Sequence, residues 1–203
     1  MEATPAQQAE KPAILKKIKD FTAAHHNSIE QNPLTKAIVD GSITKENYAK
    51  LLCGFYGFYK TCEATLANSQ LWGKENFDIA RRKKMPLLEK DLAFLGYSFA
   101  DVPACVEVPP LDSDAKKLGY LYVVEGSTLG GQFLSRAIAK KLGFTAEQGA
   151  SYFNSYGTAN LGEMWKQFQQ LLTDYAHKNP SSETEIMQAA SVTFQKLDTW
   201  LAK

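Results

Sequence analysis

Residues 113–142 constrain the fold more than any other segment, because their apolar spacing predicts one long helix that nevertheless contains several glycines. Each glycine inside a helix costs about 1 kcal/mol relative to alanine. On a helical wheel, Gly119, Gly126 and Gly130 fall within about 40° of one another, and Gly131 lies beside them. This stripe without side chains lets the backbone approach something flat, either a second helix or a planar ligand.

The other long segments also have helical period, and the sequence contains no alternating β-branched runs and no hairpin dipeptides. Pro86 marks a boundary or a kink in one of these segments. Predicted helices cover residues 14–31, 44–68, 76–95, 113–142, 158–178 and 182–202. We therefore expect one all-α domain over residues 12–203, preceded by a short disordered arm over residues 1–11.

Between these helices the sequence predicts one long connection and two capped helix starts. Residues 96–112 hold three prolines and are expected to be irregular. Thr145 with Gln148 has the capping-box spacing, which predicts another helix or helical turn. Ser182 with Glu185 repeats the pattern at the start of the last helix.

The composition is that of an ordinary globular protein, with 44% hydrophobic and 22% charged residues among 203. A net charge of +1 gives no overall attraction to nucleic acid or to an anionic membrane. No apolar run reaches the roughly 18 residues of a membrane span, and the first residues lack the apolar core of a signal peptide. Cys53, Cys62 and Cys105 include no CxxC pair, which argues against a disulfide framework or structural zinc. We expect a cytoplasmic protein.

Two adjacent histidines, His25 and His26, lie near the end of the first predicted helix and border its apolar face. A metal-ligating histidine usually donates its second ring N–H to a carboxylate, carbonyl or water. Glu30 lies one turn after His26, whereas Ile29 is the residue one turn after His25, so His26 is the better ligand candidate. The alternative is that both are ordinary boundary histidines. With no HExxH motif and no Glu-x-x-His pairs, a single histidine suits a metal that brings its own equatorial ligands, such as heme iron.

Four segments in order resemble the heme oxygenase family over roughly residues 12–202. The segment "TAAHHNSIE" is similar to the family's proximal helix, and "GFYGFYKTCEATL" to its aromatic second helix. The segment "EKDLAFLG" resembles the stretch that follows, and "LYVVEGSTLGGQFLSRAIAKKLG" resembles the glycine-rich distal helix. The form "EGSTLGG" looks most like the bacterial branch, some of whose members supply biliverdin to phytochromes. The resemblance implies a helical bundle with heme between the proximal and distal helices.

The resemblance also implies a role for individual residues. His26 would be the axial iron ligand and Glu30 would hold its ring, while Gly126 and Gly130 would lie over the iron. Lys19 and Lys166 would reach heme propionates, and Phe194 would pack on the heme. The implied catalytic positions are Tyr59, Gly126, Ser127 and Gly130, and the implied cofactor-binding positions are Lys19, Thr22, Glu30, Thr128, Gly131, Lys166 and Phe194.

One implied catalytic position departs from the family pattern. Many animal members have an aspartate immediately after the first distal glycine, and here that position is Ser127. A hydroxyl donates and accepts hydrogen bonds but carries no charge. The network of distal water therefore has to differ, with Tyr59, Glu125 and Thr128 as candidates to support it.

The reaction implied by the resemblance converts heme, O2 and electrons into biliverdin, CO and Fe(II), with heme as both cofactor and substrate. Because the sequence has no GxGxxG fingerprint, electrons would come from a ferredoxin or a flavoprotein reductase. The basic run Arg81–Lys84 could dock such an acidic partner, although a solvated helix face is the commoner explanation.

Three alternatives remain open from the sequence. One is a heme-binding or carrier protein that does not cleave heme, for which Ser127 is the best support. Another is a thiaminase-like or di-iron relative on the same helical fold. The third is a purely structural bundle, which leaves the His26–Glu30 pair and the glycine stripe unexplained.

Overall fold

A computed structural model describes residues 13–66, 69–73 and 77–203, and this part of the chain is helical apart from turns, irregular connections of which residues 102–113 are the longest, and one isolated bridge between Thr145 and Gly149. The α-helices are α1 (Ala13–Glu30), α2 (Pro33–Val39), α3 (Lys45–Leu66), α4 (Met85–Phe94), α5 (Asp114–Leu142), α6 (Gly157–Lys178) and α7 (Glu183–Leu201). Short 3₁₀ turns are η1 (Gln70–Gly73), η2 (Ala80–Arg82), η3 (Phe99–Asp101) and η4 (Pro180–Ser182). The all-α prediction is confirmed, whereas the predicted arm over residues 1–11 lies outside the described residues.

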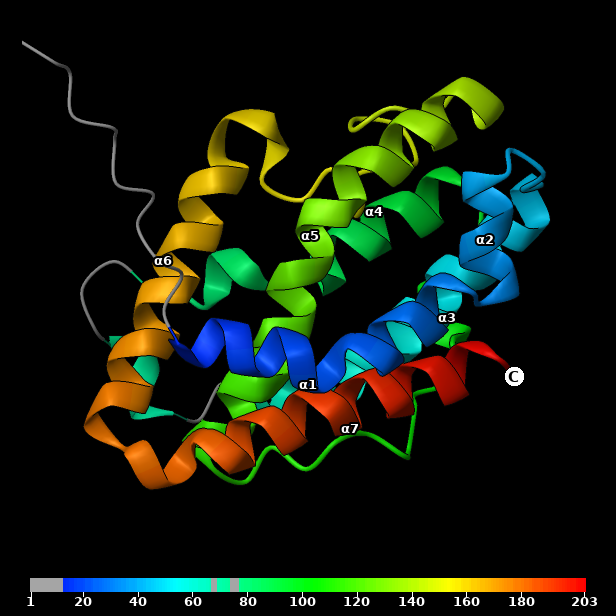
Figure 1. Ribbon diagram of the computed structural model, residues 1–203. Helices are drawn as coiled ribbons and strands as arrows, with labels where there is room; N and C mark the ends of the chain where they lie inside the picture. Colours follow the sequence, from blue (N-terminus) through cyan, green and yellow to red (C-terminus); the bar gives the residue numbers. More distant parts are fainter. Residues whose placement is uncertain (1–12, 67–68, 74–76) are drawn as a thin grey trace, which may run out of the picture.

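The long helix α5 runs through the middle of the bundle, and α1 and α7 lie side by side along one edge (Figure 1). Helix α3 supplies several buried aromatic side chains of the core, including Tyr48, Phe58 and Tyr59. These rings pack against apolar residues of α5 and α7 in one continuous hydrophobic cluster. No helix in the described ranges is long and apolar enough to span a membrane.

The ends of the helices follow local signals that are present in the sequence. Helix α5 begins after Ser113, whose hydroxyl accepts a hydrogen bond from the Lys116 amide, and it ends at Gly143 in the left-handed conformation. Pro86 lies in the first turn of α4, which confirms the predicted boundary. The sequence analysis missed α2, although Asn32 caps it through the Leu34 amide and Pro33 opens it.

The predicted turn after Thr145 and the predicted helix start at Ser182 are confirmed, but neither place has a capping box. The Thr145 hydroxyl accepts from the amide of Glu147 rather than that of Gln148, and the following residues form successive turns before α6. Ser182 precedes α7, but its hydroxyl donates to the Asn179 carbonyl and caps nothing. Glu185 instead accepts a hydrogen bond from Ser113, the residue that caps α5. Of these side chains, Glu185 bonds to another helix, whereas Thr145 and Ser182 bond to residues two and three positions away.

Candidate functional site

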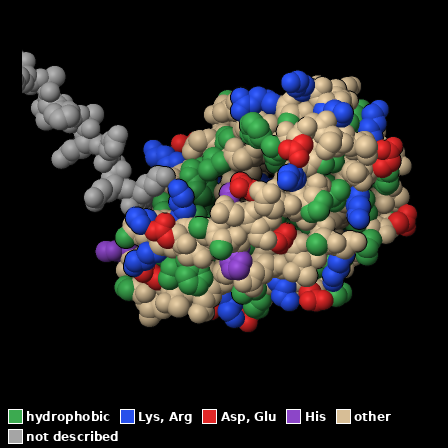
Figure 2. Space-filling view, turned by 45° about the vertical axis from the view of Figure 1, so that its right-hand side comes forward, with side chains coloured by type: hydrophobic (Ala, Val, Ile, Leu, Met, Phe, Trp, Pro, Cys, Tyr) green, Lys and Arg blue, Asp and Glu red, His purple; other side chains and the backbone are tan. Residues whose placement is uncertain are grey.

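A cavity of about 420 Å³ lies between α1, α3, α5, α7 and the segment that precedes α6. Its volume is in the range of small-molecule and cofactor sites. The walls are mostly apolar, with Phe55, Phe58, Phe153 and Phe194 among them. On the face that Figure 2 presents, acidic and basic side chains are interspersed.

Helix α1 places His26 in the cavity wall and keeps His25 out of it. The His26 Nδ1 atom is 3.6 Å from Glu30 Oε1, an ion-pair distance that is too long for a hydrogen bond. The His26 ring meets Phe194 of α7 edge to face, with 5.7 Å between the centroids. His25 Nε2 instead receives a hydrogen bond of 3.0 Å from the Gln195 amide. The structure therefore leaves His26 as the histidine that a ligand in the cavity can meet.

Helix α5 supplies the glycine wall of the same cavity. A Cβ atom added at Gly126 or at Gly130 would have no atom of the described residues within 4 Å other than its own helix backbone and chain neighbours. At Gly131 a Cβ would lie 2.9 Å from the Phe153 carbonyl oxygen, so this glycine allows close packing against the loop before α6. Gly119 does the same against α7, where a Cβ would lie 2.6 Å from Ala189 Cβ. The stripe thus packs against another part of the chain at Gly119 and Gly131 and stays open to the cavity at Gly126 and Gly130.

Four hydroxyl groups line the cavity close to the glycines. Ser127 donates to the Val124 carbonyl at 2.7 Å, and Thr128 donates to the Glu125 carbonyl at 2.6 Å, so both also bond within α5. Tyr59 and Tyr152 share a hydrogen bond of 3.0 Å. Burial raises the pKa of both tyrosines, which keeps them neutral, and interactions of its hydroxyl with Tyr59 and Ser127 partly offset the rise in the pKa of Tyr152. Tyr152 was missed by the sequence analysis because it lies in a turn with no motif.

The remaining predicted residues divide into those that reach the cavity and one that does not. Lys19 and Thr22 of α1 line it, and the Thr22 hydroxyl donates to the Ile18 carbonyl at 2.8 Å. Lys166 of α6 is exposed and is not among the lining residues, whereas its neighbour Trp165 is. The structure therefore brings Lys19 to the cavity but not Lys166, because the face of α6 that meets the cavity carries Trp165.

The basic run Arg81–Lys84 corrects the sequence analysis, which treated it as a surface feature. Arg82 and Lys84 are buried, while Arg81 and Lys83 are exposed. The expectation of a four-residue docking patch or a solvated helix face is therefore wrong for Arg82 and Lys84. The segment is not an α-helix, since η2 ends at Arg82 and α4 begins after Lys84, and its alternate side chains point inward.

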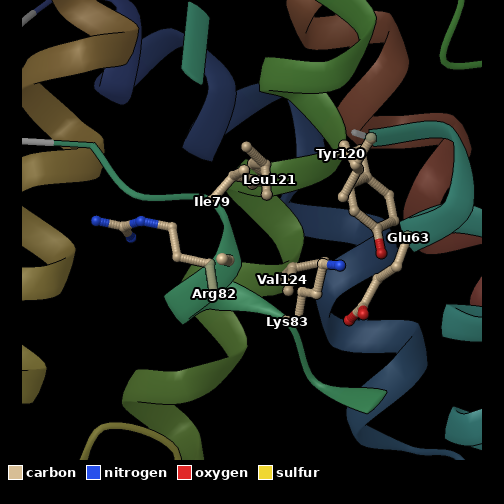
Figure 3. A pocket seen from close by; sticks show the side chains of 9 residues that line it. Glu63, Ile79, Arg82, Lys83, Tyr120, Leu121 and Val124 are labelled. Carbon is tan, nitrogen blue, oxygen red and sulfur yellow. The ribbon is translucent and has the colours of Figure 1, made fainter. Parts of the chain in front are cut away.

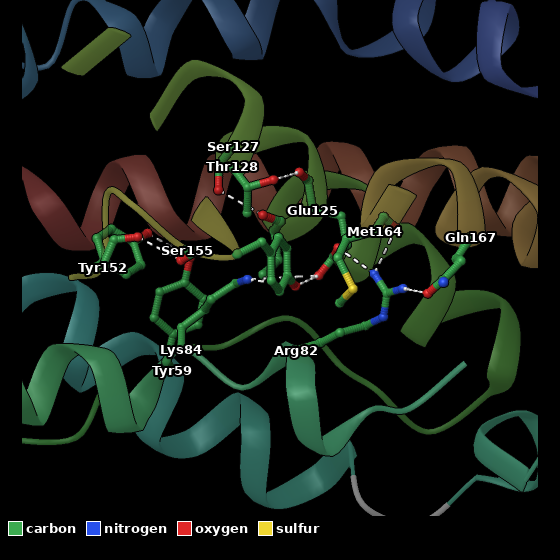
Figure 4. A network of polar contacts seen from close by, with 12 residues as sticks. Tyr59, Arg82, Lys84, Glu125, Ser127, Thr128, Tyr152, Ser155, Met164 and Gln167 are labelled. Atoms are coloured by element: carbon green, nitrogen blue, oxygen red, sulfur yellow. Dashed lines mark hydrogen bonds and ion pairs between the residues drawn. The ribbon is translucent and has the colours of Figure 1, made fainter. Parts of the chain in front are cut away.

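Glu125 of α5 is the centre of the buried network that these two cations form (Figure 4). Arg82 donates to Glu125 Oε2 at 2.5 Å and to Gln167 Oε1 of α6 at 3.2 Å. Tyr156 donates to Glu125 Oε1 at 2.7 Å and accepts a hydrogen bond of 2.9 Å from Lys84 Nζ. The side chains of Arg82, Lys84 and Glu125 are at most 1% exposed. Only Lys84 of these three also lines the cavity.

A second, smaller cavity of about 150 Å³ shares Val124 with the first (Figure 3). The side chains of Glu63 and Tyr120 enter it from α3 and α5, and the Arg82 guanidinium points away from them. Glu63 accepts hydrogen bonds from the backbone amides of Lys84 and Met85, the start of α4. This carboxylate therefore caps α4 from another helix and fixes the backbone of Lys84.

The donor set in the cavity limits its chemistry. In the described part of the chain, no three residues of the types His, Cys, Asp and Glu cluster to hold a metal ion. None of the three cysteines lines the cavity, and burial raises the pKa of the Cys62 thiol to about 12. The cavity thus offers one imidazole, a side-chain-free helix stripe, phenols, and apolar walls.

Comparison with known proteins identifies this architecture. The sequence model of the heme oxygenase family matches residues 13–203. A heme oxygenase from Xanthomonas campestris is 30% identical over 176 residues, which is 83% of this chain and 97% of that protein.

Solved structures agree on the fold. Heme oxygenase from Leptospira interrogans superposes with a TM-score of 0.76 at 18% identity, covering 93% of this chain and 98% of the other. Heme oxygenase-1 from Synechocystis, solved in complex with heme, gives a TM-score of 0.71 at 17% identity, covering 93% and 90% of the two chains. The match of the family model along almost the whole chain decides the assignment, and the chain belongs to the heme oxygenase family.

Proposed function

We propose that this protein is a heme oxygenase that cleaves heme with O2 and electrons to biliverdin, CO and Fe(II). The observation that carries the proposal is that His26 of α1 and the open glycines Gly126 and Gly130 of α5 border the same apolar cavity. An imidazole on one helix and a side-chain-free stripe on another are what a planar iron macrocycle needs from its protein.

The residues that line the cavity support heme as its ligand. The space beside Gly126 and Gly130 is where any larger side chain would project, so these positions keep room for a flat ligand. Phe194 offers an apolar face beside His26, and Lys19 offers a cation that suits a propionate. Bound heme would supply the iron at which O2 is activated and would itself be the molecule oxidised.

The chain's own residues would orient the reaction and supply protons. The His26 imidazole would bind the iron and be steadied by Glu30, which lies 3.6 Å away. The α5 backbone at Gly126 and Gly130 would restrict where a ligand on the other side of the heme can sit. Neutral Tyr59 and Tyr152, with the Ser127 hydroxyl, would hold water there and pass protons to it. The propionate contact of Lys166 stays a prediction.

The electron donor is proposed to be external, a ferredoxin or a flavoprotein reductase. Arg81 and Lys83 are the exposed members of the basic run and are the two that could meet an acidic partner. A role in supplying biliverdin to a phytochrome rests on the resemblance of "EGSTLGG" to the bacterial branch and is proposed on that basis alone.

One observation favours a second candidate, a heme-binding protein that does not cleave heme. The Ser127 hydroxyl, which stands where many family members have an aspartate, donates to the carbonyl of Val124 in its own helix. A hydroxyl used in this way orders distal water less strongly than a carboxylate. The thiaminase-like alternative has less support, because none of the cysteines borders the cavity.

An optical experiment separates the two candidates. Protein mixed with one equivalent of hemin should show a Soret band, and ascorbate or a ferredoxin system under air should replace it with the broad red absorption of biliverdin. A stable Soret band would indicate heme binding without cleavage. The absence of any Soret band would mean that only the fold is shared.

The ligand assignment is tested by two neighbouring variants. His26→Ala should abolish the spectrum of histidine-ligated heme, because no other histidine borders the cavity. His25→Ala is the matched control and should leave the spectrum unchanged, because His25 bonds to Gln195 outside the cavity. The reverse result would overturn the choice of His26.

A further inference from the structure

Lys84 is a buried cation in the wall of the cavity that the proposed reaction does not yet use. Its side chain is 1% exposed, and it borders the cavity together with Gly126 and Ser127. Its Nζ atom lies 3.9 Å from Glu125 Oε1, and Glu125 directly precedes Gly126 on α5. The ammonium is therefore tied to the residue next to the glycine wall.

The fold holds Lys84 at both ends. Glu63 of α3 accepts hydrogen bonds from the backbone amides of Lys84 and Met85. Tyr156 accepts a hydrogen bond of 2.9 Å from the Lys84 ammonium, which also lies 4.2 Å from the centre of the Tyr156 ring. Tyr156 then donates to Glu125, so three elements converge on one lysine.

Burying Lys84, Arg82 and Glu125 together lowers the stability of the folded state, which argues against a purely stabilising role for this cluster. Each buried ion loses several kcal/mol of hydration, and buried ion clusters are often no more stable than apolar replacements. Tyr156 adopts a φ of 71°, a left-handed conformation that costs a non-glycine residue about 1–3 kcal/mol. Strain of this kind persists mainly where surrounding contacts require it, and it clusters at functional sites.

The hydrogen bonds of Lys84 leave capacity unused. An ammonium group has three donors. Within the residues that the structure describes, Lys84 Nζ makes one hydrogen bond, to Tyr156, since Glu125 Oε1 at 3.9 Å is too distant for another. Buried donors without partners are rare in native proteins, and the cavity is the space that Lys84 borders.

We propose that Lys84 is a positioning residue whose ammonium donates hydrogen bonds to water or to a small anionic ligand held between the heme and the α5 glycine wall. This inference rests on the proposed function, because it places heme in the cavity. Lys84 would then place a charged donor beside the uncharged Ser127, from a different element of the fold, with a positive charge where the aspartate of many family members is negative.

The surrounding charges are consistent with a cation that can also release a proton. Burial lowers the pKa of Lys84 to about 8, while Glu125 and Glu63 oppose this shift and Arg82 adds to it. Lys84 therefore remains mostly protonated near neutral pH and loses its charge in a range where an ordinary lysine does not.

Ligand binding to the hemin complex tests the inference without relying on turnover. Azide, an anion, and imidazole, a neutral ligand, are titrated into the ferric complex near pH 7 and followed in the Soret band. Lys84→Met should weaken azide about tenfold and leave imidazole within about twofold, because only the anion interacts with the lost charge. Lys83→Met is the matched control, since Lys83 is adjacent but exposed, and it should change neither affinity.

Equal azide affinity in the wild type and Lys84→Met would overturn the inference, and so would an equal loss of azide and imidazole, which indicates general damage to the cavity. Heme oxygenase activity measured in the same wild-type preparation shows separately whether the proposed function holds.

A second measurement uses the heme-free protein, so that it remains decisive if hemin does not bind. Cyanate carbamylates neutral amines, and the sites are read by mass spectrometry. Near pH 8, Lys84 should react because burial lowers its pKa to about 8 and its side chain borders the cavity, although at 1% exposed it should react more slowly than the exposed Lys83. Bound hemin should slow the carbamylation of Lys84, which borders the cavity, and leave the carbamylation of Lys83 unchanged. A Lys84 that stays unmodified without hemin would show that its ammonium does not face accessible space and would overturn the inference.

Discussion

Gly119 and Gly126 lie on nearly the same face of α5, two turns apart, but they meet opposite surroundings. A Cβ atom at Gly119 would collide with the Ile186 carbonyl oxygen and lie 2.8 Å from the Ala190 amide nitrogen of α7. At Gly126, and one further turn along at Gly130, the same Cβ would project into the open cavity. The first glycine of the stripe therefore allows helix packing, and the later two leave space in the cavity.

The difference shows that a glycine stripe is not a single functional unit. At Gly119 the missing side chain lets α5 and α7 approach closely, so the cost of glycine in the helix is offset by packing. At Gly126 and Gly130 nothing packs, so the same cost contributes only to the site. Substitutions at the two ends should consequently separate stability from activity.

The largest effect is expected for Gly119→Leu. The leucine side chain would clash with backbone atoms of α7, because even its Cβ atom has no room there. Overpacking of this severity should lower the unfolding free energy by about 3 kcal/mol or more. Urea unfolding measures the loss, with Gly119→Ala as a milder version that keeps the protein folded. A Gly119→Leu protein as stable as the wild type would remove the distinction between the two ends of the stripe.

Gly130→Phe should show the opposite combination. The ring would project into the cavity, so unfolding free energy should stay within about 1 kcal/mol of the wild type, while biliverdin formation falls about a hundredfold. Some hemin binding should remain, because His26 is unchanged. Unaltered turnover, measured by biliverdin absorbance, would count against assigning this part of α5 to the site.

The smallest effect is expected for Gly126→Ala. A methyl group here meets no other atom within 4 Å beyond the local helix, so alanine should raise the unfolding free energy by up to about 1 kcal/mol through helix propensity alone. Thermal or urea unfolding of the heme-free protein detects this gain. Destabilisation would mean that Gly126, like Gly119, is needed for packing.

Most of the predicted heme-contacting residues border the same cavity, because they lie on helix faces that can be identified from the spacing of residues in the sequence. Thr22, His26 and Glu30 lie at helical spacing on α1, and all border the cavity. Their roles remain predictions, but their convergence follows from periodicity. Lys166 is the exception. It is exposed, and its neighbour Trp165 is the residue of this turn of α6 that borders the cavity.

The buried cations could not be predicted in the same way. In sequence, Arg82 and Lys84 belong to a basic run that is typical of a solvated surface. They are buried because Glu125, Gln167 and Tyr156, all distant in sequence, surround them with acceptors. The run passes from the 3₁₀ turn η2, which holds Arg82, to the short link before α4, which holds Lys84, and this path without an α-helix lets alternate side chains point inward.

The sequence by itself determined the all-α class and most helix ends, and it predicted His26 rather than His25 as the ligand, because these depend on local periodicity and spacing along one helix. The tertiary structure alone decided which glycines pack against α7 and which open onto the cavity. It also decided that Lys84 and Tyr152 join the cavity wall. These outcomes depend on contacts between residues far apart in the chain, and no local pattern encodes which distant backbone or acceptor a given side chain will meet.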